Sequence, residues 1–430
     1  MVGPLDGVNV FEVSQIIAGP VCGQNLADLG ANVVKVEPPR GDAGRVLGGF
    51  LPGESKFFHA LNRGKRSLVI DLQHLSGQEV VHRIIPNFDV FIINARPGVP
   101  VRLGVDYETL SGIRPDLIYM ENTGYGTVGP NKDRSGSDIV AQAYSGLMAA
   151  DGKLTDDGAP ELITATAPAD YISAFAGAMG ICAALYQRSL TGKGQYVGTS
   201  LLASALQLQS PVISRIPVAD AAVRDAMEQA LADGRANGAK YSELLEHRGD
   251  IFSLLGAAFR LYYGGYQTKD GAIILGALTP ANRKQMRDVL EIEDDPTESA
   301  DFNALDPNND PVVEKVRDQI KQTMSTRTSA EWMTDFDRVG APASPVQFPE
   351  ELTDDPQVQA LGLMRSFEHE LVGDEKLVGP IIEMPGTGIG SPLPSPILDR
   401  HTDEVLEECG LTEAEIESLR NEKAIGIPTE

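Results

Sequence analysis

Short apolar runs alternate with helical stretches through the first 125 residues of the chain. The runs that predict strands are VNVFEVS (8–14), ANVVKVE (31–37), SLVIDL (67–72), DVFIINA (89–95) and LIYMEN (117–122). Helical patterns at 21–30, 76–88 and 107–115 separate them. Strands that alternate with helices at this spacing are typical of a parallel sheet covered on both faces. The pattern therefore predicts an α/β fold with a doubly wound, Rossmann-like large domain.

In such sheets a ligand binds beyond the carboxyl ends of the strands. Those ends carry residues 14–19, 37–40, 94–96 and 122–125. A nicotinamide dinucleotide is a poor candidate, because the first loop offers only Gly19 before Pro20 and no GxGxxG motif. The glycine-flanked Tyr125 could stack on a ligand, although such a motif is more often a simple turn.

The longest apolar helical pattern begins just after Pro168 and breaks at Gly192. A helix that is apolar all round is normally buried, so we expect this one inside the core. Asp170 stands at its start. One interpretation makes Asp170 only an N-cap. The other is a carboxylate held ionised at the helix N-terminus and reached by a substrate.

The pattern of charged and apolar residues changes near residue 218. A charged helical stretch is followed by a predicted hairpin around Lys269-Asp270-Gly271 and by charged helices at about 279–292 and 311–325. We therefore expect residues 1–217 to form the first part of the large domain and 218–330 a small α+β domain. Residues 331–430 are expected to return and complete the large domain.

The composition narrows the possible partners. The 430-residue chain carries a net charge of −25, which disfavours nucleic acid and anionic membranes. The chain lacks a signal-like N-terminus and an uninterrupted apolar run of about 18 residues, so we expect no membrane segment. Its three cysteines are widely spaced, which suits a reducing cytoplasm. Its six histidines form no HxxxH pair, so we predict no metal.

Because basic residues are scarce, their grouping is informative. Several lie near predicted strands or strand ends: Lys35, Arg40, Arg63, Lys65, Arg66, Arg96 and Arg102. They could converge on the ligand-binding edge of the sheet and hold phosphates, or they could be solvated surface charges.

Several motifs together resemble one family, the family III (CaiB/BaiF) CoA-transferases. They include the N-terminal stretch from Pro4 to Asp42, NRGKRSLVIDL, IINARPG, ENTGYGTVGP, SDIVAQAYSGLM, ADYISAFAGAMGICAALYQRSLTGKGQ and the terminal HTDEVLEECGL. They occur in order over nearly the whole chain. The resemblance implies an enzyme that moves CoA from an acyl-CoA donor to a small carboxylic acid acceptor. CoA and acyl-CoA are then substrates, with no permanently bound cofactor.

The resemblance also implies roles for individual residues. Asp170 matches the catalytic aspartate, whose carboxylate attacks the thioester and forms a mixed anhydride. The residues that match CoA-contacting or site positions are Ile17, Ala18, Arg40, Asn94, Ala95, Arg102 and Tyr125. The glycine loop that covers the aspartate in formyl-CoA transferase is reduced here to Gly264 and Gly265 within LLGAAFRLYYGG. The family further implies an interlocked homodimer.

Three other functions stay open at this stage. A racemase acting on α-methylacyl-CoA would resemble the same family, but Ser137 stands where that branch has its histidine. An acyl-CoA lyase coupled to CoA transfer and a noncatalytic CoA-binding module are the other two.

Overall fold

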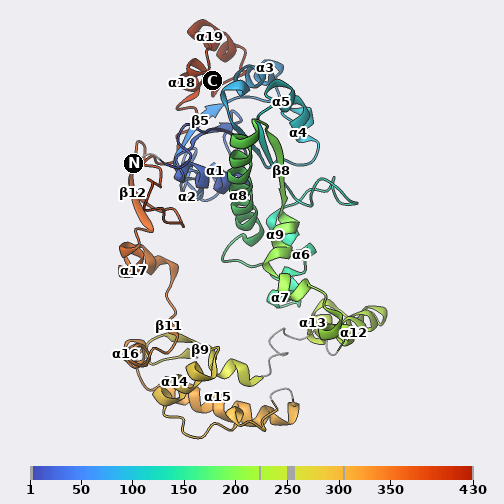
Figure 1. Cartoon of the computed structure of the whole chain (residues 1–430), viewed down its shortest axis with the longest axis vertical. Coiled ribbons are helices and arrows are strands. Elements are labelled where there is room, and N and C mark those ends of the chain that lie inside the picture. Colours follow the sequence, from blue (N-terminus) through green and yellow to red (C-terminus); the bar gives the residue numbers. More distant parts are fainter. Residues whose placement is uncertain (1–2, 222–223, 249–256, 304–305, 429–430) are drawn as a thin grey trace. The chain divides into compact units, whose positions relative to one another are not determined.

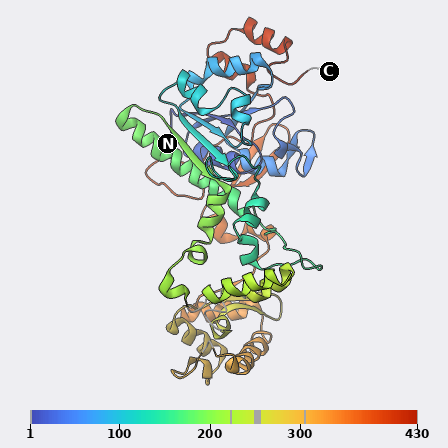
Figure 2. The same cartoon turned by 90° about the vertical axis from the view of Figure 1, so that its right-hand side faces the viewer.

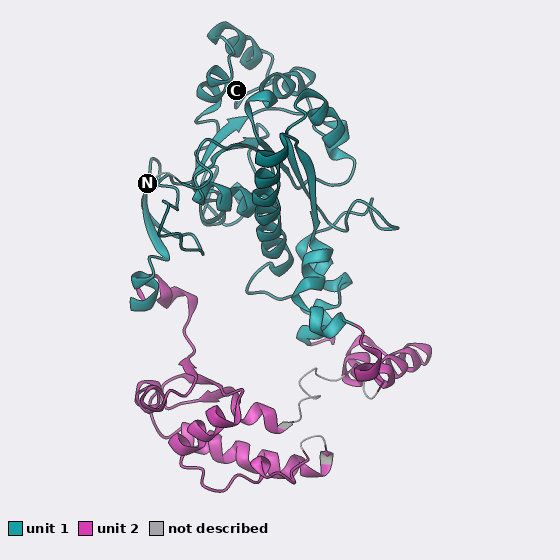
Figure 3. Ribbon diagram, in the orientation of Figure 1, with its two compact units in different colours: residues 1–155, 160–214, 356–430 teal, residues 156–159, 215–355 magenta. Residues whose placement is uncertain are grey.

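The computed structural model describes residues 3–221, 224–248, 257–303 and 306–428, which fall into two compact units. Unit 1 contains Met1–Thr155, Pro160–Ser214 and Pro356–Glu430, and unit 2 contains Asp156–Ala159 and Arg215–Asp355 (Figure 3). The larger unit is thus built from both ends of the chain. Figures 1 and 2 show this from two sides, with the blue N-terminal and red C-terminal segments in the same unit.

A six-stranded parallel sheet forms the centre of unit 1. Its strands are β1 (Asn9–Val13), β2 (Asn32–Glu37), β5 (Lys65–Val69), β6 (Val90–Ile93), β7 (Ile118–Thr123) and β8 (Gln195–Ser200). They lie in the order β5-β2-β1-β6-β7-β8. The chain therefore builds outward from β1 in one direction and then from β6 in the other, as in Rossmann-type sheets. The predicted α/β fold with a parallel sheet is confirmed.

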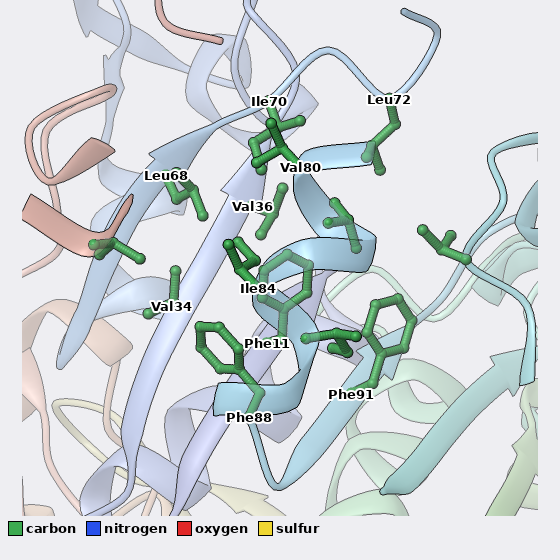
Figure 4. Close-up of a cluster of buried hydrophobic side chains, with 14 of the residues drawn as sticks. Phe11, Val34, Val36, Leu68, Ile70, Leu72, Val80, Ile84, Phe88 and Phe91 are labelled. Atoms are coloured by element: carbon green, nitrogen blue, oxygen red, sulfur yellow. The ribbon is translucent and has the colours of Figure 1, made fainter. Parts of the chain in front are cut away.

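Successive side chains of the strands point to opposite faces of the sheet and pack into two separate hydrophobic cores. On one face the Phe11 ring stacks on Phe91 at a centroid distance of 5.8 Å (Figure 4). Phe91 in turn stacks on Tyr119 at 5.0 Å. The helices that cover this face are α3 (Leu75–Ile84), α5 (Tyr107–Ile113), α18 (Thr402–Glu408) and α19 (Glu413–Asn421). On the other face the sequence neighbours of these residues, such as Val10, Ile92 and Met120, pack against α1 (Ala18–Asp28) and α8 (Pro168–Thr191). The two-residue period of a strand thus produces three layers.

The helix α8 differs from the expectation that it is buried all round. Ala174, Ala178 and Ile181 face the core. Met179, Tyr186 and Leu190 lie on the opposite side and are 71%, 69% and 68% exposed. Among the described residues α8 is also the one helix long and apolar enough to cross a membrane, with 39% of its most apolar window buried. The expectation from the sequence counted only uninterrupted apolar runs, and a core helix of a soluble protein passes the same length and composition test.

Smaller elements complete unit 1. They are the pair β3 (Gly49–Leu51) and β4 (Glu54–Ser55), the hairpin β12 (Met364–His369) and β13 (Gly373–Val378), and the short helices α2 (Lys56–Asn62), α4 (Val99–Arg102), α6 (Asp138–Tyr144), α7 (Leu147–Asp151), α9 (Leu201–Leu208), α10 (Ser210–Ile213) and α17 (Pro356–Ala360).

Unit 2 has its own core around an antiparallel sheet. Strands β9 (Tyr263–Gln267) and β10 (Ala272–Gly276) form the predicted hairpin, and β11 (Ala343–Pro345) pairs with β10. The main helices are α14 (Pro280–Leu290), α15 (Asp310–Met324) and α16 (Ser329–Val339), and the charged arm forms α11 (Pro217–Asp220), α12 (Arg224–Ala236) and α13 (Tyr241–Arg248). Because Trp332 and Phe336 of α16 pack into this core, unit 2 extends to Asp355 rather than ending at residue 330.

Candidate active site

A cavity of about 630 Å³ opens at the carboxyl ends of the central strands in unit 1. Its wall includes Ser14–Ala18 after β1, Arg40 after β2, Asn94–Pro97 after β6 and Asn122–Gly124 at the end of β7. The order of the strands reverses between β1 and β6, so the cavity lies where parallel α/β sheets bind their ligands.

The structure brings seven of the eight residues singled out in the sequence to this cavity. They are Ile17, Ala18, Arg40, Asn94, Ala95, Arg102 and Asp170. Tyr125 follows the cavity residue Gly124, but its own side chain is 9% exposed and packs edge-on against Tyr144, with ring centroids 5.1 Å apart. The side chain of Tyr125 is therefore buried and does not line the cavity in this structure.

The loop after β1 is held in an unusual backbone conformation. Ile16 has a φ of 72°, a left-handed value that is unfavourable for a β-branched residue. Its N–H donates to Asp42 Oδ1 at 3.2 Å. The Asn94 side chain clamps the neighbouring Gln15, accepting from its N–H at 2.9 Å and donating to its carbonyl at 2.8 Å. Asn94 thus positions the first loop through both atoms of its amide.

Adjacent to the cavity and to its first loop lies a group of buried, paired charges, which we call the floor network: Glu12, Lys35, Glu37, Asp42, Arg45 and Lys65. Lys35 Nζ lies 2.8 Å from Asp42 and 3.2 Å from Glu12, and it donates to the Ser14 carbonyl at 2.9 Å. Although burial opposes its charge, these carboxylates raise the pKa of Lys35 above its usual range. The network thus ties the floor of the cavity to its first loop.

Three arginines, which we call the rim arginines, line the cavity differently. Arg40, Arg96 and Arg102 are exposed, and in the described ranges none of their guanidinium groups has an ion pair or hydrogen bond. The sequence left two possibilities open for the other basic residues, ligand binding or solvated surface charge, and neither describes them. Lys35 and Lys65 belong to the floor network, Arg63 pairs with Asp28, and Arg66 pairs with Glu404 and Glu408.

Asp170 is half-buried in the first turn of α8, on the cavity wall. It does not cap the helix. The N-cap position is Ala167, and a carboxylate from another helix takes over the capping role: Asp138 Oδ1 accepts from the N–H groups of Ala169 at 2.7 Å and Asp170 at 3.1 Å. Over the described residues no donor contacts the Asp170 carboxylate itself. That carboxylate is left for a ligand.

The electrostatics of Asp170 also differ from the sequence expectation. Burial, and then the nearby charge of Asp138, raise the pKa of Asp170 to about 7. The helix N-terminus was expected to keep this carboxylate ionised, but Asp138 already occupies the N–H groups that would do so. Asp138 was missed in the sequence because it lies 32 positions before Asp170, at the start of another helix. The only signal was an aspartate after a serine at a helix start.

Comparison with known proteins identifies the class. Residues 5–402 match the model of the family described as "CoA-transferase family III", so the chain belongs to that family. Human succinyl-CoA:glutarate CoA-transferase is 30% identical over 94% of this chain and 86% of its own length. A succinate–glutarate CoA-transferase of Agrobacterium fabrum is 33% identical over 94% of this chain and 95% of its own. A CaiB/BaiF family protein from Brucella suis superposes with a TM-score of 0.73 at 27% identity, covering 95% of this chain and all of the other.

Proposed function

We propose that this CoA-transferase moves CoA from succinyl-CoA, or a similar dicarboxylic acyl-CoA, to a small dicarboxylic acid through a covalent intermediate on Asp170. The observation that carries the proposal is a carboxylate, on the wall of a large cavity at the ligand-binding edge of the sheet, to which no donor in the described part of the chain is hydrogen-bonded. The acids are suggested by the names of the similar enzymes, which act on succinyl or glutaryl groups.

The chemistry divides one difficult exchange into thioester and anhydride steps. A carboxylate oxygen of Asp170 attacks the acyl-CoA carbonyl, the C–S bond breaks, and CoA leaves as a thiolate. The thiolate attacks the aspartyl carbonyl of the mixed anhydride, releasing the donor acid and leaving CoA on Asp170. The acceptor carboxylate then reverses these two steps, so that CoA leaves on the acceptor and Asp170 is regenerated.

The surroundings of Asp170 suit these steps. Only the ionised carboxylate attacks, and a pKa of about 7 makes that form available near neutral pH while keeping the oxygen more basic than an ordinary aspartate. The rim arginines supply unpaired positive charge in an acidic chain, which favours the phosphates of CoA and the second carboxylate of a dicarboxylic acid. The half-buried position limits the water that would hydrolyse the anhydride.

The racemase alternative needs a base at position 137. Ser137 lies on the cavity wall, and a serine hydroxyl is a poor base in place of histidine. The lyase and noncatalytic alternatives share the same CoA site, and the assay below separates them by their products.

The test is to incubate the protein with succinyl-CoA and glutarate and to follow new CoA esters by mass spectrometry. Asp170→Asn, which is isosteric, should lower exchange by at least about a thousandfold. Asp151→Asn removes a surface carboxylate at the end of α7 and should leave exchange unchanged. Full exchange in Asp170→Asn would overturn the mechanism. Incorporation of solvent deuterium at the α-carbon without CoA exchange would favour the racemase.

We also propose that the protein works as an interlocked homodimer in the cytoplasm, on the grounds of its family membership. Light scattering that reports a stable monomer at micromolar concentration would contradict the dimer.

The two glycines that remain of the glycine loop do not lie in a loop, since Gly264 and Gly265 belong to β9 and pair with Leu275 and Ile274. Leu254 to Gly256 of the same stretch lie outside the described residues.

A further inference from the structure

A buried glutamine, Gln142, holds the aspartate that caps α8. Asp138 and Gln142 both belong to α6 and stand one turn apart, so their side chains lie on the same face of that helix. The amide nitrogen Nε2 of Gln142 donates a hydrogen bond to Asp138 Oδ2. Gln142 is fully buried, and a buried amide needs partners for both its donor and its acceptor group.

The acceptor side of the Gln142 amide also has a partner. Its Oε1 accepts from the N–H of Ile163 at 3.1 Å, in the segment that leads from α7 into α8. These two partners fix the orientation of the amide, because an ionised carboxylate only accepts hydrogen bonds and a backbone N–H only donates them. With the amide reversed, both contacts would be repulsive. Gln142 therefore has one favourable orientation, in which it joins α6 to the segment before α8.

The two carboxylate oxygens of Asp138 have separate partners. Oδ2 contacts Gln142, whereas Oδ1 accepts from the N–H groups of Ala169 at 2.7 Å and Asp170 at 3.1 Å. Holding one oxygen sets the rotation of the whole carboxylate, so the contact with Gln142 keeps the other oxygen on the start of α8. Hydrogen bonds to an ionised carboxylate are among the stronger ones in proteins, and a helix N-terminus favours negative charge.

The donor to Asp138 is neutral, and this affects Asp170. A lysine or arginine in the same place would form an ion pair and cancel the charge of Asp138, whereas an amide binds the carboxylate and leaves its charge in place. That charge is the second cause, after burial, of the raised pKa of Asp170. Two other kinds of ionisable group lie near Asp170. The rim arginines line the same cavity, and Tyr171 follows on α8 with a phenol whose pKa is raised by burial and by Asp170.

We propose that Gln142 is a positioning residue for CoA transfer: it holds Asp138 on the N–H groups at the start of α8 and thereby keeps the Asp170 carboxylate available to the acyl group. The proposal rests on the function proposed for Asp170. Gln142 does not line the cavity, so it acts through Asp138. If Asp138 turned away, the released N–H groups would bind the Asp170 carboxylate instead, which would lower its pKa and make it a weaker nucleophile.

The alternative is a purely structural role. Gln142 would then hold only Ile163 and the packing of α6, and its loss would lower the stability of unit 1 without changing Asp170. The two roles differ in what they predict for the protonation of one carboxyl group, which can be measured without any turnover.

The test measures the protonation of Asp170 directly. The full-length chain is treated with a water-soluble carbodiimide and an amine over a range of pH, and labelling of Asp170 is quantified by peptide mass spectrometry. Carbodiimides react with the protonated carboxyl, so labelling of the wild type should decline with a midpoint near pH 7. Gln142→Met is similar in size but cannot donate. Its midpoint should lie lower, so that labelling at pH 7, relative to that at pH 5.5, falls by about two- to fourfold.

The matched control is Gln209→Met. Gln209 is also a buried glutamine of unit 1, but its Nε2 donates to the carbonyl groups of Ser145 and Ala205 and not to a carboxylate. This variant should lose stability to a similar degree and leave the labelling midpoint of Asp170 in place.

The exchange assay adds a kinetic readout. Near pH 8 Asp170 is ionised in both proteins, so Gln142→Met should lower kcat by up to about tenfold through the weaker nucleophile alone. The KM for the acyl-CoA should stay within about twofold of wild type, because the rim arginines are untouched.

Two results would overturn the proposal: a labelling midpoint in Gln142→Met equal to that of wild type, or an equal shift in Gln209→Met. If Gln142→Met fails to fold, Gln142→Glu decides. Its new carboxyl can donate to Asp138 only while the pair shares a proton, so its loss of unfolding temperature relative to wild type should grow as the pH rises. A loss that does not change with pH contradicts the contact. A wild type that is labelled as expected but transfers no CoA would instead count against the proposed function, so the two failures are distinguishable.

Discussion

The floor network and the rim arginines are two groups of charge at one cavity, and they are organised in opposite ways. Every residue of the floor network is at most 2% exposed, and each lies within salt-bridge distance of a residue of opposite charge. The rim arginines are exposed, and within the described ranges they have no ion pair. Paired and buried charges fix a structure, whereas unpaired charges on a cavity are free for a ligand.

Asp170 belongs to neither group. It is half-buried like a structural charge, yet its carboxylate has no donor among the described residues, as a reactive group requires. In the proposed mechanism the ionisable residues of the site therefore have three roles: Lys35 and its partners hold the first loop, the rim arginines would bind anions, and Asp170 would perform the chemistry.

The largest effect is expected from breaking the floor network. Lys35→Met leaves Asp42 and Glu12 without the cation that contacts both, and uncompensated buried charges typically cost about 3–5 kcal/mol. The free energy of unfolding, measured by urea titration, should fall by about that amount. The pKa of Asp42 is lowered chiefly by Lys35, against the opposing effect of burial, so part of the loss should disappear at low pH, where Asp42 is protonated.

The matched control for that experiment is Lys153→Met. Lys153 pairs with Asp151 at 3.3 Å and is 51% exposed, so its loss should change stability by less than about 0.5 kcal/mol. If both variants lost the same free energy of unfolding, burial of the floor network would not increase its contribution to stability.

The sequence predicted the central sheet but missed contacts between charged residues and partners that are far apart in the chain. Apolar runs such as 8–14 and 31–37, separated by helical patterns, sufficed to predict a parallel α/β sheet, because the signals that mark strands and helices lie in the local sequence. The role of Lys35 was not visible, because a lysine in a strand looks the same whether a carboxylate 23 positions earlier faces it or not. Capping of α8 by Asp138 was missed for the same reason, because Asp138 and the start of α8 meet only after the chain has folded.

A smaller effect is expected at the rim. Arg102→Ala removes an unpaired guanidinium from the cavity wall, and a lost charge-assisted contact of about 1.5 kcal/mol corresponds to roughly a tenfold rise in KM for the acyl-CoA. The value of kcat should change little, and the difference from wild type should shrink at high salt. Arg400→Ala is the control: Arg400 has the same charge but pairs with Glu370 on the surface. A tenfold rise in KM there as well would assign the effect to net charge.

The smallest effect is expected from removing the negative charge of Asp138, which caps α8 and raises the pKa of Asp170. Because the ionised form of Asp170 is reactive, the wild-type rate should fall as the pH drops through about 7. Asp138→Asn keeps an oxygen that can accept from the N–H groups of Ala169 and Asp170 but removes the negative charge. The pKa of Asp170 should then lie lower, and the pH–rate profile should shift to lower pH.

At pH 6 a group with a pKa of about 7 is roughly one-tenth ionised, so Asp138→Asn can gain at most about tenfold in rate there and almost nothing at pH 8. Asp151→Asn makes the same change of charge at a distance and should leave the profile in place. If Asp138→Asn lowers the rate equally at every pH while the unfolding temperature drops, then Asp138 matters as the cap of α8 and not through its charge. A shifted pH–rate profile with an unchanged plateau would instead show that the charge of Asp138, in addition to burial, raises the pKa of Asp170.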